Sequence, residues 1–138
     1  MIRPDGSQPA PKGFIGNNQL NVPWGVSIDG NDDIWVGNFW ARGVMLMAGD
    51  DTKGHPAGTK AGDAIHNFQS GSIQIITDVA IDPAGNVWAA NNWNDIEPVV
   101  SNDPIRRTST WGGGSGITVI YGVAAPVKTP LMGQVRKP

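Results

Sequence analysis

One stretch of the chain is repeated further along it. Residues 22–40 align without a gap with residues 75–93, and six matched pairs are identical. The pairs are Val26 and Val79, Ile28 and Ile81, Asp29 and Asp82, Trp35 and Trp88, Asn38 and Asn91, and Trp40 and Trp93. Because Trp is a rare residue, two Trp pairs in register indicate a true repeat. Repetition at a fixed spacing is typical of folds built from stacked copies of one structural unit.

A second match follows each copy. Residues 43–49 align with residues 116–122, at an offset about twenty residues larger than that of the first match. The second repeat therefore carries a loop insertion, within residues 94–115, between its second and third expected strands. The insertion contains Pro98, Pro104 and a run of Gly at 112–114. This composition predicts an irregular loop.

Each copy has the pattern of short β-strands joined by tight turns. The chain contains 19 Gly and 11 Pro, and no segment shows the period of an amphipathic helix. Turn residues at 29–32 and 82–85 separate the first expected strand of each copy from the second. In the third expected strand of each copy, the residues that point to either face of the sheet are apolar. This pattern predicts that these strands are covered on both faces. The expected strands are residues 25–29, 34–38 and 44–48 in the first copy and 78–82, 87–91 and 117–121 in the second.

The motif of the repeat resembles the NHL repeat and the related streptogramin-lyase-like repeat. The resemblance rests on Pro-Trp-Gly-Val-Ser-Ile-Asp at 23–29 and on Gly-Asn-Val-Trp-Ala-Ala-Asn at 85–91. The segment 119–130 is also similar to the C-terminal end of bacterial propellers of this group. The resemblance implies an all-β fold, a partial β-propeller of two to three antiparallel blades with long inter-strand loops. We expect one domain over residues 1–138, with repeat one at 22–49, repeat two at 75–122 and a C-terminal tail at 123–138.

An incomplete propeller needs partners for its open faces. Propellers of this group usually close with six blades, and one blade takes roughly 40–45 residues, so this chain supplies three blades at most. Each blade buries a face on the next, which leaves two apolar faces open in an incomplete ring. The expected partners are the remaining blades of a longer chain or further copies of this chain. We favour the longer chain, because the tail is similar to a native end and the start is not.

The resemblance also allows a test for catalysis, position by position. Lyases of the streptogramin type place a His before the Gly of the first strand and a Glu at the end of the second, with Mg²⁺ assisting. Those positions hold Trp24 and Asn38 in one repeat and Thr77 and Asn91 in the other, and none of these residues can act as the base. Gluconolactonase-like propellers use Asn or Asp before the Gly as a metal ligand, which Trp24 and Thr77 do not match. We therefore predict no catalytic residue, no metal ligand and no cofactor in these blades.

The expected function is binding of a ligand or partner, such as a small molecule or carbohydrate, by a non-catalytic propeller segment. The alternative is a fragment of a propeller enzyme, a metal-dependent lyase or lactonase, whose active site lies in blades that this chain does not include. Reading the genomic sequence upstream of Met1 distinguishes the two, because the enzyme needs its reactive set at the equivalent repeat positions.

Five residues are candidates for ligand binding. Asn38 and Asn91 end the second expected strands near the mouth of the channel and are suited to a sugar or carboxylate; the alternative is an Asn that bonds its own backbone. Trp40 and Trp93 are suited to stacking on a sugar ring, and the alternative is packing between blades. Asp78 has Gly25 at its matched position; it either lines the channel or is a solvated carboxylate.

Other conspicuous side chains have structural interpretations. Trp35 and Trp88 lie inside expected strands, which predicts that both belong to the core. His55 and His66 stand alone in a connection over 49–72 that is rich in Gly, Pro and Lys, and we expect both at the surface.

Composition excludes several classes of protein. The net charge is −2 with scattered Lys and Arg, so we expect no nucleic acid and no membrane as partner. The chain has no Cys, which excludes disulfides and Cys-ligated zinc. It has no apolar stretch near the ~20 residues of a membrane helix and no apolar segment of a signal peptide at its start. An extracytoplasmic or secreted location is implied only by the family resemblance, and the compartment stays open.

Overall fold

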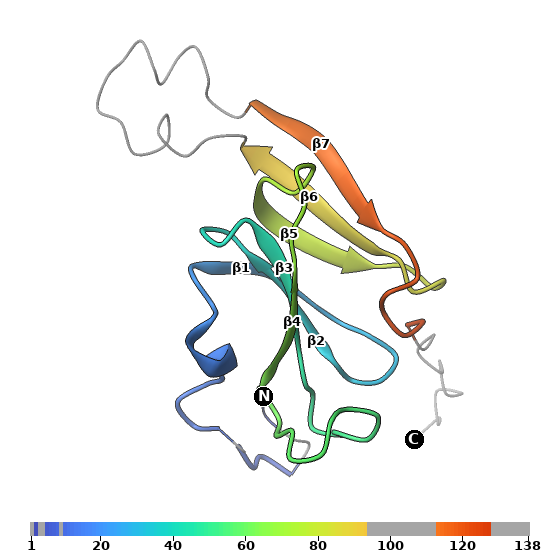
Figure 1. Cartoon of the computed structure of the whole chain (residues 1–138). Coiled ribbons are helices and arrows are strands. Elements are labelled where there is room, and N and C mark those ends of the chain that lie inside the picture. Colours follow the sequence, from blue (N-terminus) through green and yellow to red (C-terminus); the bar gives the residue numbers. More distant parts are fainter. Residues whose placement is uncertain (1, 3–4, 9, 94–112, 128–138) are drawn as a thin grey trace, which may run out of the picture.

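The computed structural model describes residues 2, 5–8, 10–93 and 113–127 (Figure 1). These residues form two antiparallel β-sheets, of four and three strands, and one 3₁₀ helix, η1 (Gly16–Asn18). The expectation of an all-β fold is confirmed. Within the described ranges, no helix has the length and apolar character needed to cross a membrane.

The first sheet holds the first repeat. Its strands, β1 (Pro23–Ile28), β2 (Ile34–Asn38), β3 (Gly43–Met47) and β4 (Ala64–Phe68), are neighbours in sequence order. β1 to β3 were expected from the repeat. β4 lies within the connection 49–72, where the repeat pattern predicted no strand. It pairs antiparallel with β3 and extends the sheet by one strand.

The second sheet holds the second repeat. Its strands are β5 (Ile75–Ile81), β6 (Val87–Trp93) and β7 (Gly113–Ile120), again in sequence order. β7 begins at Gly113, so the expectation that the loop insertion extends to residue 115 was wrong. Pairing with β6 brings Gly113 into the ladder, opposite Trp93. The insertion at 94–112 and the tail at 128–138 lie outside the described residues.

The two sheets pack face to face. β1, β2 and β3 of the first sheet lie against β5 of the second (Figure 1). The core between the sheets includes Trp35 and Val44 from the first sheet with Val79, Val87 and Ala89 from the second, all buried. Burial of one large apolar side chain stabilises a fold by about 1.5–3 kcal/mol, so this interface is the main apolar core of the molecule.

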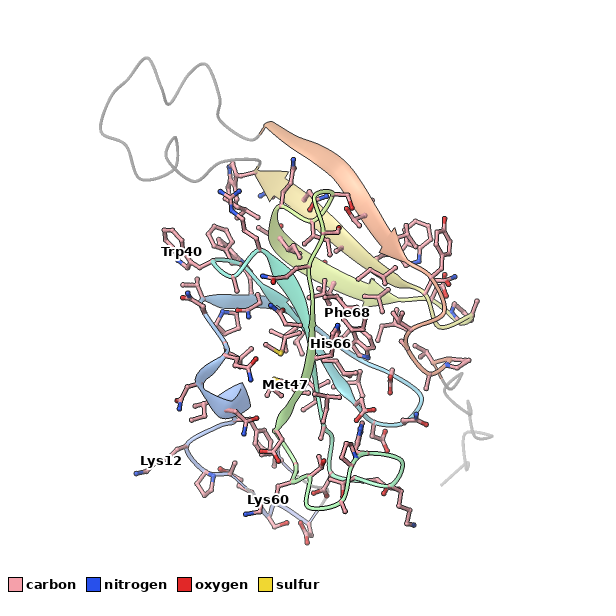
Figure 2. The ribbon with its side chains drawn as sticks, viewed as in Figure 1. Lys12, Trp40, Met47, Lys60, His66 and Phe68 are labelled. Carbon is pink, nitrogen blue, oxygen red and sulfur yellow. The ribbon has the colours of Figure 1, made fainter. Side chains whose placement is uncertain are left out.

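A second apolar cluster lies on the opposite face of the first sheet. Val36, Met45 and Met47 are buried there, and Phe14 and Leu20 of the N-terminal segment pack against them. Figure 2 labels Met47. The first sheet is therefore covered on both faces near β3, as its continuous apolar run predicted.

The repeated Asp and Trp make the same hydrogen bonds in both sheets. Trp35 Nε1 donates to Asp29 Oδ2 at 3.1 Å, and Trp88 Nε1 donates to Asp82 Oδ2 at 3.0 Å. In each turn the other carboxylate oxygen accepts two backbone N–H groups at 2.8–3.1 Å. One carboxylate thus closes the turn between the first and second strands and fixes the indole that follows. This double use explains why Asp and Trp recur together.

The environments of the two Trp residues differ. Trp35 is fully buried, which confirms its predicted place in the core, whereas Trp88 is 41% exposed, so the prediction for Trp88 was wrong. The face of the second sheet that carries Trp88 has no further sheet against it among the described residues. For the same reason Ile117 of β7 is exposed, although its pattern predicted a strand covered on both faces.

After β7 the chain returns to the first sheet. This C-terminal strap, residues 122–126, donates from Ala124 N to Gly85 O and from Ala125 N to Asp29 Oδ2, both at 3.1 Å. Gly30 N donates to Ala125 O at 3.1 Å. The strap therefore joins the turn of the second sheet to the matching turn of the first.

Candidate functional site

Four aromatic rings meet at one end of the two sheets. This aromatic cluster consists of Trp24 of β1, Phe39 and Trp40 directly after β2, and Trp93 at the end of β6. Phe39 is central, with ring centroids 4.9 Å from Trp24, 5.9 Å from Trp40 and 5.6 Å from Trp93. Trp24 and Trp93, from different sheets, lie 6.0 Å apart. Figure 2 labels Trp40 at this end of the first sheet.

The cluster has a buried base and an exposed surface. Phe39 is buried, whereas Trp24 is 56% and Trp40 is 44% exposed. Trp93 is half-buried, and its indole Nε1 is shielded from solvent without a hydrogen-bond partner among the described atoms. Large exposed indole surfaces fixed on a buried ring are typical of binding surfaces, because the rings are held in place before a ligand arrives.

The structure thus brings two of the predicted site residues into one cluster. Trp40 and Trp93 both pack on Phe39. Trp93 also contacts Trp24 across the two sheets, the kind of contact that the packing alternative expected. Sequence reasoning did not place Trp24 and Phe39 in the site, because their matched residues in the second repeat are Thr77 and Asn92.

Asn38 and Asn91 occupy equivalent buried positions. Asn38 Nδ2 donates to Gln19 O, and its Oδ1 accepts from Asn21 N, at 2.9 and 2.6 Å. Asn91 makes the matching bonds with the backbone of residues 72 and 74, both at 2.9 Å. Both amides therefore hold the segment that leads into the first strand of their sheet. This geometry favours the backbone-bonding alternative for both residues, and a ligand role stays a prediction.

Asp78 lies within β5, and it is exposed. Its Oδ1 accepts from Val79 N at 2.9 Å. Together with Ala80, Trp88, Ala90 and Ile117, it lines a shallow depression of about 180 Å³ on the open face of the second sheet. Its predicted role in ligand binding stays untested.

The two histidines differ. His55 was expected at the surface but is half-buried, because its Nε2 lies 2.8 Å from Oδ1 of the buried Asp33. The same oxygen accepts from Gly49 N at 3.1 Å, so the pair fixes the β3–β4 loop. His66 of β4 is exposed, as expected, and lies edge-on to Phe68 (Figure 2). Among the described residues, no group of three or more His, Cys, Asp or Glu side chains could hold a metal ion.

The carboxyl group of Asp82 has a perturbed pKa. The backbone N–H of Asn86, the indole of Trp88 and the side chain of Asn86 donate to it and lower its pKa to about 2. A group whose pKa is lower in the folded state stabilises the fold above its unfolded pKa of about 3.9. This contribution is lost as the pH falls towards the folded value.

Replacing Asp82 by Asn is therefore expected to weaken the acid dependence of stability. Between about pH 4 and pH 2, Tm of the variant should fall less steeply than Tm of the wild-type chain. Thermal unfolding followed by circular dichroism across this range measures the effect. Equal slopes for the two proteins would contradict the assignment of the hydrogen bonds to the ionised carboxylate.

Comparison of the chain with protein-family models, with curated proteins and with solved structures found no match in any of the three. The site is therefore interpreted from its geometry alone.

Proposed function

We propose that this chain is a non-catalytic, ligand-binding segment of an NHL-type β-propeller, and that its aromatic cluster binds carbohydrate. The single observation that carries the proposal is the cluster itself. Trp24, Trp40 and Trp93 surround a buried Phe39, and two of the three indoles are widely exposed.

The propeller part of the proposal is supported by how the repeats fold. Each repeat forms its own antiparallel sheet with strands in sequence order. One sheet buries its apolar face on the next, and the most extensive contact between the sheets is between their first strands, β1 and β5. Propeller blades have this order and this packing, and repeat proteins in general stabilise each unit through its neighbours.

The carbohydrate part follows from the chemistry of an indole. A π-face is electron-rich, so it attracts the polarised C–H groups on one face of a pyranose ring. Indole N–H groups and nearby backbone groups bind hydroxyl groups. Trp24 and Trp40 both contact Phe39, and two neighbouring aromatic platforms suit an oligosaccharide better than a single sugar.

Titration with soluble oligosaccharides tests the proposal. Cellohexaose, maltohexaose and chitohexaose serve as probes, with tryptophan fluorescence and calorimetry as measurements. At least one probe should bind, and Trp40→Ala should weaken its binding about tenfold, the equivalent of about 1.4 kcal/mol. Tyr121→Ala is the matched control, because Tyr121 is an exposed aromatic residue outside the cluster. Failure of all probes to bind, or equal affinity of Trp40→Ala and wild type, would overturn the carbohydrate assignment.

A further inference from the structure

The contact between the two sheets joins two different faces. The first sheet contributes its front face, which carries Trp35 and Val44. The second sheet contributes its back face, which carries Val79, Val87 and Ala89. The contact is therefore heterologous, because the front face of one sheet packs on the back face of the other. Since the two sheets are copies of one repeat, each sheet also has the face that the other sheet uses in this contact.

The unused front face belongs to the second sheet. The residues that match Trp35 and Val44 are Trp88 and Ile117. Trp88 is 41% and Ile117 is 62% exposed, whereas Trp35 and Val44 are fully buried. Side chains that are buried in one copy of a repeat and exposed in the other mark a contact that one copy has made and the other has not.

The matching back face of the first sheet is covered only in part, by Phe14 and Leu20, which pack against Val36. The residues that match Val79, Val87 and Ala89 are Val26, Ile34 and Val36. They line one apolar groove with a volume of about 700 Å³. Phe14 and Leu20 form its other wall, and Val26 is 62% exposed. The groove thus exposes Val26, which matches Val79 of the contact between the two sheets, while Val36 is buried at its base.

We propose that the front face of the second sheet docks into the back-face groove of a second copy of this chain, with Trp88 as the buried side chain. One chain carries a face that matches each half of the contact between its own two sheets. Such a head-to-tail contact closes into a ring or continues as a filament, depending on the rotation between copies. The inference rests on the matched faces and not on the proposed carbohydrate site, although Trp24 lines both the groove and the aromatic cluster.

One position opposes a close fit. Gly25 on the front face of the first sheet touches the β5 backbone, and a Cβ there would lie 2.5 Å from Asp78 Cα. The matched front-face residue in the second sheet is Asp78 itself. Near Asp78, a second copy must therefore lie further from β5 than the two sheets of one chain lie from each other at Gly25. The Asp78 carboxylate also loses hydration in the contact. The contact is then carried by Trp88 and Ile117, and Asp78 limits its affinity.

Sedimentation velocity over a range of concentrations tests the proposal on the full 138-residue chain. The wild-type chain should self-associate. Trp88→Arg and Val26→Arg should each weaken association at least about tenfold, because a buried unpaired cation costs more than 1.4 kcal/mol. Ala57→Arg is the control, since it adds the same charge to an exposed loop residue. Circular dichroism and urea unfolding establish that each variant is folded.

Mixing the two blocked variants tests the head-to-tail geometry. Trp88→Arg keeps an intact groove, and Val26→Arg keeps an intact front face, so an equimolar mixture should form a dimer that neither forms alone. Asp78→Gly should tighten self-association about tenfold, because it removes the opposing side chain. A wild-type chain that is monomeric at all concentrations, association insensitive to both Arg variants, or a mixture that stays monomeric would each overturn the proposal.

Discussion

Replacing Trp35 by Ala is expected to lower the free energy of unfolding by about 3–5 kcal/mol. The side chain is fully buried and stacks on Phe68 with ring centroids 5.3 Å apart. Its removal leaves a cavity between the two sheets and takes the indole donor away from Asp29. Urea unfolding, followed by circular dichroism and extrapolated to water, measures the loss.

The repeat supplies a matched control for this prediction. Trp88 donates the same hydrogen bond to its own Asp but is 41% exposed. Trp88→Ala should therefore cost about 1 kcal/mol, in the ordinary range for a point mutation. The comparison must be made at a concentration where the wild-type chain is monomeric. Equal losses for the two variants would contradict the assignment of Trp35 alone to the core.

Replacing Asn38 by Ala is expected to cost about 2–4 kcal/mol, because two partly buried backbone groups lose their partner and a fully buried group would cost about 1–3 kcal/mol. The amide is fully buried between Gln19 O and Asn21 N. Urea unfolding again measures the effect. Asn31→Ala is the control, since Asn31 is an exposed turn residue, and it should change stability by about 0.5 kcal/mol or less.

The same variant separates the two interpretations of Asn38. If Asn38 holds the chain in place, the Asn38→Ala variant still folds but has a lower free energy of unfolding. A residue kept for a ligand would change stability little, and its loss would appear only in binding. A stable Asn38→Ala chain would therefore favour the ligand role that the sequence suggested.

The sequence predicted the all-β fold and most of its strands because one short motif carries many of their physical requirements. Asp29 and Trp35, six residues apart, close a turn and fill a core position together. Such a local pair is visible in the chain without any knowledge of the rest. β2 has the predicted bounds, and the other expected strands differ from prediction by up to four residues at an end, where pairing with a neighbour decides how far a strand extends.

Features that depend on distant partners could not be predicted from the sequence. β4 has little apolar alternation of its own and is a strand because β3 pairs with it. His55 is held by Asp33, which is 22 residues away in sequence. The exposure of Trp88 depends on what packs against its sheet, and a motif alone cannot specify that. The aromatic cluster was half-predicted, since only Trp40 and Trp93 recur at matched positions.

The return of the C-terminal strap has a consequence for the order of folding. Ala125 N reaches Asp29 from a position 96 residues later in the chain, and contacts of such long range form late and slow the search for the native state. The first four strands can pair through local hairpins while a ribosome is still synthesising the remainder. The carboxylate that orients Trp35, however, receives its last backbone donor only when residue 125 has left the exit tunnel. The hydrogen bonds of Asp29 in the first sheet are therefore complete only after all strands of the second sheet have been synthesised.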